Sequence, residues 1–189
     1  MNVLFLNPPF FNHFSRESRS PAVAKSSTLY YPKWLAHAAG VAIKNGHNVD
    51  MIDAPAWGVD IQYVLDRIEN KRIEAIVCDC STPSIINDLR VVEQINKRFP
   101  DLHVLMVGRH VSVLPNETLR QSKTLKYIAI REYEYTVRDW LAAIDCNASL
   151  DAVDGLVWKN TKGEIIKNKE RALITNLDEL PFVPEVYKR

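Results

Sequence analysis

Five short apolar runs, separated by stretches of helical periodicity, constrain the fold of this chain more than any other feature. Each run is rich in Val and Ile and is bounded by turn residues, as expected for strands buried on both faces of a sheet. The runs are NVLFL (2–6), NVDMID (48–53), EAIVCDC (74–80), HVLMVG (103–108) and KYIAI (126–130).

The segments between these runs repeat apolar residues at helical spacing, with charged residues on the opposite face. Parallel strands need crossover connections, which are usually helical and right-handed. The alternation therefore predicts an α/β fold of the Rossmann or flavodoxin-like type, with a five-stranded parallel sheet and helices on both of its faces. The predicted helices cover residues 31–46, 60–71, 84–100, 115–122 and 133–146.

The pattern changes after residue 150. The stretch DGLVWKNTKGEIIKNKE (154–170) alternates around a turn at Asn160–Gly163 and predicts a β-hairpin. The stretch TNLDELPFVPEVYKR (175–189) contains two prolines and few core positions, which is typical of a linker. We therefore expect an α/β domain over residues 1–150, followed over 151–189 by a hairpin and a linker toward a missing domain.

Composition narrows the class of protein. A chain of 189 residues suits one core with a small extension, and a net charge of +1 does not indicate a nucleic-acid-binding surface. The N-terminal MNVLFLNPPFF has no basic region and only four consecutive apolar residues, so we expect no signal peptide, no membrane span and a cytoplasmic location.

The three cysteines lack the spacing of a disulfide framework or a metal site. Cys78, Cys80 and Cys146 form no C-x-x-C pair, which argues against zinc or an iron–sulfur cluster held by this chain alone. We expect Cys78 and Cys80 to be small buried residues of a strand.

In an open parallel sheet, ligands bind outside the carboxyl ends of the strands. The loops that follow the predicted strands carry small, hydroxyl or amide residues that can bind a polar ligand. No dinucleotide fingerprint, phosphate-binding loop or serine nucleophile motif occurs in the sequence. The five loops begin at Asn7, Asp53, Ser81, Gly108 and Arg131.

The first of these loops is unusually long. It runs from Asn7 to about Tyr31 without a clear apolar period, and loops of this length are usually functional or disordered. Its cations Arg16, Arg19 and Lys25 could meet a phosphate or carboxylate, but solvated charges on a loop are the more common situation, and we expect them here.

Six collinear segments resemble the N-terminal cobalamin-binding half of radical S-adenosylmethionine enzymes, a group that includes cobalamin-dependent methyltransferases and anaerobic magnesium-protoporphyrin monomethyl ester cyclases. The resemblance covers essentially the whole chain. The segments are NPP (7–9), GHNVDMIDA (46–54), GRHVSVLPNETL (108–119), REYEYTVRDWLAAI (131–144), VDGLVWKNTKGEII (153–166) and NLDELPFVP (176–184).

The resemblance implies cobalamin as the cofactor. In that family a second, barrel-like half carries a C-x3-C-x2-C motif for a [4Fe–4S] cluster that cleaves S-adenosylmethionine, and this chain lacks that motif. It therefore implies that the missing radical domain and a small-molecule substrate are the partners, and that the chain alone is not catalytic. Methyl transfer, or a radical cyclisation or rearrangement, is the reaction implied for the full-length enzyme.

The resemblance also implies which residues hydrogen-bond the corrin amides and the nucleotide tail. The family usually has glycine at the positions of Arg109 and Arg131, so these two cations either pair with ligand oxygens or block the cavity. The implied cofactor-binding residues are Asn7, Pro8, Ser81, Thr82, Gly108, Arg109, His110, Ser112, Arg131, Glu132, Glu134 and Thr136.

No side chain is predicted to bind cobalt. Other cobalamin-binding domains carry a D-x-H-x-x-G histidine after the first strand, and the loop around His13 lacks this motif. His103 precedes a strand and is expected to be a strand-entry residue. His110 is better placed, but in the resembling family that loop contributes mainly backbone and small side chains.

Two other hypotheses remain open. A flavodoxin-like or receiver-like module would bind another small ligand or a protein, with Asp53 or Asp79 as phosphoacceptor, although no acidic pair follows the first strand. A degenerate domain would keep the fold and a partner interface but not the cofactor, which the replacements Arg109 and Arg131 could cause.

Overall fold

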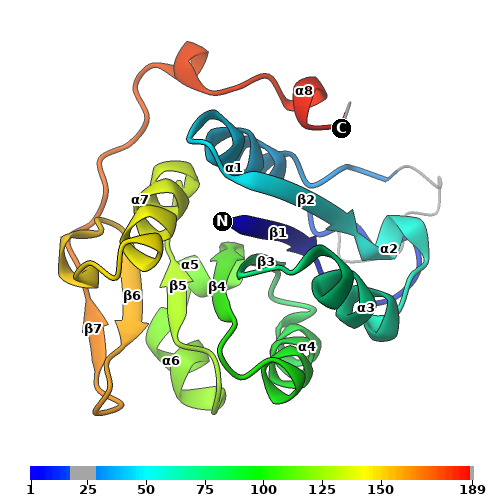
Figure 1. The fold of residues 1–189 in the computed structure, drawn as a ribbon, viewed down its shortest axis with the longest axis horizontal. Coiled ribbons are helices and arrows are strands. Elements are labelled where there is room, and N and C mark those ends of the chain that lie inside the picture. Colours follow the sequence, from blue (N-terminus) through cyan, green and yellow to red (C-terminus); the bar gives the residue numbers. More distant parts are fainter. Residues whose placement is uncertain (18–28, 188–189) are drawn as a thin grey trace.

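The computed structural model describes residues 1–17 and 29–187, which contain a seven-stranded sheet in the order β2-β1-β3-β4-β5-β6-β7 (Figure 1). The first five strands are parallel and β6 and β7 are antiparallel. The strands are β1 (Asn2–Asn7), β2 (Asn48–Asp53), β3 (Ala75–Cys80), β4 (His103–Gly108), β5 (Tyr127–Ala129), β6 (Leu156–Lys159) and β7 (Ile165–Lys167).

The predicted five parallel strands and the C-terminal hairpin are therefore confirmed. The hairpin does not stand apart from the sheet, because β6 pairs with β5 through Tyr127–Trp158 and its neighbours. The β5 edge has unpaired backbone groups, and an antiparallel partner satisfies them. The sheet consequently has two more strands than its parallel part.

Five helices match the predicted ones: α1 (Lys33–Lys44), α3 (Ile61–Lys71), α4 (Ile85–Arg98), α6 (Pro115–Gln121) and α7 (Glu134–Asp145). The sequence pattern did not indicate five shorter elements, which span too few residues to show a period. These are α2 (Ala54–Trp57), α5 (Arg109–Val113), η1 (Leu150–Ala152), η2 (Leu177–Glu179) and α8 (Val183–Tyr187).

Helices cover both faces of the sheet, as predicted. Helices α1 and α7 lie on one face, and α3, α4 and α6 lie on the other (Figure 1). All six residues of β3 are buried, and they alternate between the two cores: Val77 packs toward α1 and α7, whereas Cys78 packs toward α3 and α4. Cys78 and Cys80 are buried free thiols, which confirms their predicted structural role.

The expected linker contributes more to the core than its sequence indicated. Leu180, Val183 and Val186 are buried, and α8 packs against α1. Gly40 of α1 makes room for this segment, since a Cβ atom at that position would lie 2.9 Å from the Cβ atom of Pro181. The three buried side chains recur every three residues, so a short helical stretch can bury them together. The expectation of a stretch with little core is wrong here.

No helix within the described residues combines the length and the hydropathy that a membrane span requires. Arg19 and Lys25, two of the first-loop cations that are expected to be solvated, lie outside the described residues.

Candidate functional site

The carboxyl ends of the five parallel strands meet along one edge of the sheet, here called the carboxyl edge. The register pairs Asn7 with Asp53 and Cys80 with Gly108, so the loops that follow these strands start side by side. The strand order reverses between β1 and β3, the topological feature next to which ligands bind in flavodoxin-like sheets.

A cavity of about 510 Å³ opens at this edge, here called the carboxyl-edge cavity. Six of the predicted site residues line it: Gly108, Arg109, Ser112, Arg131, Glu132 and Glu134. Ten further lining residues were not among the predicted cofactor-binding residues. They come from the first loop, α1, the end of β3, the end of α5, the fifth loop and the segment before α8. They are Arg16, Glu17, Trp34, Asp79, Cys80, Val113, Tyr133, Ile174, Leu177 and Leu180.

Gly108 ends β4 in a conformation that other residues rarely adopt, with φ at 115°. A Cβ atom there would collide with the carbonyl oxygen of Cys80 and would lie 2.7 Å from Oδ1 of Asp79. Helix α5 begins at the next residue. Glycine is therefore required at this point for β4 to turn directly into α5 above the end of β3.

Ser112 connects the fourth and fifth loops. Its hydroxyl donates to the carbonyl oxygen of Gly108 and accepts from the backbone N–H of Arg131, both at 2.9 Å. Arg131 has a φ of 60°, in the left-handed region that favours glycine. The resembling family usually has glycine at this position, and Arg131 keeps the same kind of backbone conformation.

The side chains of Arg109 and Arg131 are directed toward carboxylates and solvent. Arg109 pairs with Glu17 at 3.8 Å and its side chain is 65% exposed. Arg131 pairs with Glu170 at 2.9 Å and its side chain is 56% exposed. Both residues contribute to the wall of the cavity without burying their cationic groups in it.

Arg16 is buried, so the expectation of a solvated loop charge is wrong for this residue. Its guanidinium donates to Oδ1 of Asn7 at 2.5 Å, to the carbonyl oxygen of Pro8 at 3.0 Å and to the carboxylate of Asp88 at 2.6 Å. The side chains of Arg16 and Asp88 are 1% and 0% exposed. A charge can be buried in this way only when it is paired and hydrogen-bonded. The partner, Asp88, lies 72 residues away, and no local sequence pattern indicates it.

Three predicted residues thus support the site from behind instead of lining it. Asn7 and Pro8 bind Arg16, and Asn7 also donates to Asp53 at 2.7 Å. The Ser81 hydroxyl lies 2.8 Å from that of Ser84, which donates to Asp88. This chain of contacts holds the first loop against the carboxyl edge.

The remaining predicted residues are placed elsewhere. Nδ1 of His110 lies 3.3 Å from the hydroxyl of Thr82, neither residue lines the cavity, and burial lowers the pKa of His110. The hydroxyl of Thr136 donates to the carbonyl oxygen of Asp154 and accepts from Nε of Arg171, so it joins α7 to the hairpin.

Acidic side chains contribute to the polar lining of the cavity, together with Ser112 and three arginines. Asp79 accepts a hydrogen bond from the N–H of Cys80 at 2.8 Å, and burial raises its pKa to about 7. Burial also raises the pKa of Glu134, whose Oε2 has no hydrogen-bond partner among the described residues. Glu132 instead accepts from the N–H of Ile174 at 2.7 Å. Among the described residues, no group of three or more His, Cys, Asp and Glu side chains could hold a metal ion.

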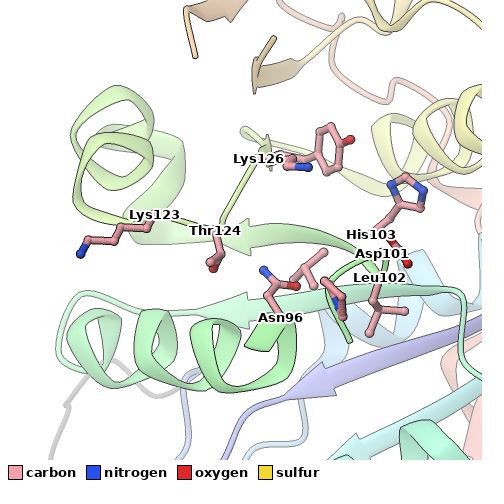
Figure 2. Close-up of a pocket in the computed structure, with 10 residues that line it drawn as sticks. Asn96, Asp101, Leu102, His103, Lys123, Thr124 and Lys126 are labelled. Atoms are coloured by element: carbon pink, nitrogen blue, oxygen red, sulfur yellow. The ribbon is translucent and has the colours of Figure 1, made fainter. Parts of the chain in front are cut away.

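A second cavity of about 520 Å³ lies at the opposite edge of the sheet, where β4 and β5 begin, and is here called the amino-edge cavity (Figure 2). Asn96, Asp101, Thr124 and Lys126 line it, and none of the predicted cofactor-binding residues does. His103 also lines it, at the first position of β4, as expected for a strand-entry residue.

Comparison with known families identifies the kind of domain that this fold and cavity form. The family model of the B12 binding domain matches residues 19–141. The chain belongs to the B12-binding domain family. The match extends from the first loop into α7 and so contains β2 to β5, whose ends form the carboxyl edge.

The relatives of this B12-binding domain are longer proteins. An uncharacterised methyltransferase of Pyrococcus horikoshii is 28% identical over 183 residues, which cover 96% of this chain and 38% of the relative. An anaerobic magnesium-protoporphyrin IX monomethyl ester cyclase of Rubrivivax gelatinosus is 21% identical over 184 residues, which cover 95% of this chain and 32% of the relative. The chain thus spans about a third of the length of the curated relatives it matches.

Solved structures confirm the fold. The cobalamin-dependent S-adenosylmethionine radical enzyme OxsB, with aqua-cobalamin bound, superposes with a TM-score of 0.71 at 17% identity, over 91% of this chain and 22% of that chain. The radical S-adenosylmethionine methyltransferase TsrM of Kitasatospora setae, with cobalamin and a [4Fe–4S] cluster bound, gives a TM-score of 0.68 at 15% identity, over 95% of this chain and 30% of that chain. The B12-binding domain therefore has the fold of the corresponding parts of radical enzymes.

Proposed function

We propose that this B12-binding domain holds cobalamin in the carboxyl-edge cavity. The observation that carries the proposal is the position of Gly108, whose bare backbone lines a cavity at the carboxyl edge of a flavodoxin-like sheet. A glycine in this position lets a large ligand approach the backbone closely.

The residues of the cavity suit a corrinoid. A corrin ring presents a broad, mostly apolar face with carboxamide groups around its rim. Trp34, Ile174 and Leu180 supply apolar walls, and Ser112 and the buried Glu134 supply polar groups. Ligand sites in proteins usually combine a predominantly apolar lining with a few polar groups in this way.

In this proposal the protein positions the cofactor and shields one of its faces. When bound, cobalamin supplies cobalt-centred alkyl-transfer or one-electron chemistry. Ser112 fixes the fourth and fifth loops relative to each other, and Arg109 and Arg131 lie where they can meet amide oxygens or the phosphate of the nucleotide tail. We propose no protein ligand to cobalt, since the Nδ1 atom of His110 faces Thr82 outside the cavity.

We further propose that the domain serves a longer enzyme. The relatives are longer than this chain, and OxsB and TsrM are radical S-adenosylmethionine enzymes, which supports a radical S-adenosylmethionine domain as its partner. The [4Fe–4S] cluster and S-adenosylmethionine would bind in that domain. Methyl transfer, or a radical cyclisation or rearrangement of a small molecule, would be the reaction. A cytoplasmic location agrees with the free thiols Cys78, Cys80 and Cys146.

Equilibrium titration of the purified chain with hydroxocobalamin tests the binding proposal. We expect a change in the visible spectrum, quenching of tryptophan fluorescence through Trp34, and co-elution of cofactor and protein. Absence of all three signals in a folded protein would refute cobalamin binding.

The degenerate-domain alternative makes a different prediction for the same titration. If Arg109 and Arg131 block the cavity, binding should occur only after both are changed to glycine. The exposed, paired side chains of these residues favour binding in the unmodified chain. Comparing the chain with the variant Arg109→Gly/Arg131→Gly separates the two proposals.

A further inference from the structure

We propose that Asp79 and Glu134 form a carboxyl floor in the carboxyl-edge cavity that binds neutral carboxamide groups of a corrinoid and rejects the corresponding carboxylates. This inference rests on the proposed function, because it concerns the same cavity. It adds a chemical selectivity for the rim of the ligand.

The two carboxyls reach the cavity from different elements. Asp79 is the next-to-last residue of β3, and Glu134 is the first residue of α7. Both are more than nine-tenths buried and both line the cavity. The buried ring of Tyr133 also lines the cavity. Burial raises the pKa of the Tyr133 hydroxyl, and the charges of Asp79 and Glu134 raise it further. The sheet and the helix therefore bring the two groups to the wall of one cavity.

Each floor residue has hydrogen-bonding capacity that the protein does not use. Oε2 of Glu134 is buried without a hydrogen-bond partner among the described residues. Asp79 uses Oδ1 to accept from the N–H of Cys80, and no described residue donates to its Oδ2. Buried polar atoms almost always have partners, so Oε2 of Glu134 indicates a ligand that supplies one, and Oδ2 of Asp79 is free to bind the same ligand.

The cations near the cavity do not neutralise the floor, because each is paired with another carboxylate. Arg16 binds Asp88, Arg109 pairs with Glu17, and Arg131 pairs with Glu170. Of these cations, only Arg16 is buried, and its side chain pairs directly with the buried Asp88.

Burial without a cationic partner disfavours the charged form of a carboxyl. Burial raises the pKa of Asp79 to about 7, although the charge of Arg16 acts to lower it. Burial also raises the pKa of Glu134, although a hydrogen bond from its own backbone N–H acts to lower it. The charges of Glu17 and Asp88 raise the pKa of Asp79 further, and that of Glu132 raises the pKa of Glu134. In either protonation state, a free carboxyl oxygen of the floor can accept a hydrogen bond from the N–H of a primary amide.

A carboxylate in place of that amide has no N–H to donate. It also brings a negative charge next to two acidic groups, and like charges in a partly desolvated site are costly. The floor should therefore distinguish a corrinoid amide from its hydrolysed form although the two have nearly the same shape.

The test compares hydroxocobalamin with the cobalamin monocarboxylic acids, in which one peripheral propionamide is hydrolysed to an acid. Dissociation constants come from quenching of tryptophan fluorescence at pH 8. We expect at least one of the acids to bind about tenfold more weakly than hydroxocobalamin. In Asp79→Asn/Glu134→Gln, which keeps the shape of the floor, this ratio should fall below about threefold.

A matched control is Asp53→Asn, which removes a carboxyl from the same edge outside the cavity and should leave the ratio unchanged. If the double variant is poorly folded, the single variants Asp79→Asn and Glu134→Gln are measured, and each should lower the ratio. Equal binding of hydroxocobalamin and every acid would overturn the floor while leaving cobalamin binding intact. Failure of hydroxocobalamin to bind would overturn both proposals.

Discussion

The two edges of the sheet carry cavities of almost the same volume, about 510 Å³ at the carboxyl edge and 520 Å³ at the amino edge, but they differ in construction. The carboxyl-edge cavity contains Gly108 at a φ of 115°, Arg131 at a φ of 60° and Glu134, whose buried Oε2 has no partner among the described residues. The amino-edge cavity also contains buried polar atoms without partners among the described residues, Oδ1 of Asn96 and Oγ1 of Thr124. It differs in that no residue at positive φ lines it and that its charged residues Asp101, Lys123 and Lys126 are exposed (Figure 2).

This difference shows that cavity size does not identify the binding site. Strained backbone and unpaired buried polar groups destabilise a protein and persist at functional sites, where a ligand or a mechanism uses them. Of the two cavities, only the one at the carboxyl edge combines residues at positive φ with an unpaired buried polar group, next to the strand-order reversal. The predictions that follow contrast the two edges.

The largest difference should appear when an ion pair is broken at each edge. Arg16→Met leaves Asp88 buried without its cation and should lower the free energy of unfolding by about 3–5 kcal/mol. Arg98→Met at the amino edge breaks the exposed pair with Glu69 and should cost less than about 1 kcal/mol. Urea unfolding of both variants measures this, and equal losses would contradict the anchoring role of Arg16.

Replacing glycine by alanine should have a larger effect in the cavity backbone than in an ordinary turn. Gly108→Ala places a methyl group against Cys80 and Asp79. It should lower the free energy of unfolding by about 3 kcal/mol and abolish binding of hydroxocobalamin. Gly163→Ala in the hairpin turn, also at positive φ but with open space around it, should cost about 1 kcal/mol and leave binding unchanged. Similar losses at the two glycines in urea unfolding would show that the crowding at Gly108 is unimportant.

The buried carboxyl at the floor predicts a pH dependence. Between about pH 4 and pH 7 the folded state keeps a proton on Asp79 that the unfolded state has lost, so its contribution to stability falls as pH rises and is fully lost above pH 7. The full rise in the pKa of Asp79 corresponds to a change of about 4 kcal/mol in the free energy of unfolding. We expect about 2 kcal/mol, because the side chain faces a cavity.

Asp79→Asn should therefore melt several degrees above the unmodified chain at pH 8, and this difference should disappear near pH 4. Thermal unfolding across this range tests the prediction, with Glu164→Gln in the exposed hairpin turn as control. A difference in melting temperature that does not vary with pH would contradict the assignment.

The smallest effect is expected at the amino-edge cavity. Lys123→Ala and Lys126→Ala remove exposed cations that the proposed function does not use, so the dissociation constant for hydroxocobalamin should change by less than about twofold. A tenfold loss of affinity for hydroxocobalamin in the fluorescence titration would indicate that the cofactor binds at the amino edge instead.

Much of this fold could be predicted from the sequence, because strand burial and helical period act over a few residues. β2 and β4 begin and end as predicted, whereas α5 has five residues and follows Gly108 without a loop, too short to show a period. The pattern also missed the packing of Val183 and Val186 against α1, which depends on contact with a helix 140 residues earlier in the chain.

The site was less accessible to sequence reasoning for the same physical reason. Strand ends identified Gly108, Glu132 and Glu134, since the carboxyl edge follows from the parallel topology. Trp34, Leu180 and the buried Arg16 reach the cavity or its support through tertiary contacts that no local pattern encodes. The positive φ of Arg131 is likewise hidden in the sequence, although a resemblance to glycine-bearing relatives indicates it.

Hydrogen exchange of the chain with and without hydroxocobalamin is the most direct test of the central claim that the carboxyl-edge cavity binds the cofactor. The structure predicts slower exchange on binding in residues 108–113, 131–136 and 174–180, with no change in residues 101–104 and 123–127. Protection confined to the amino edge, or no protection at saturating hydroxocobalamin, would contradict the claim.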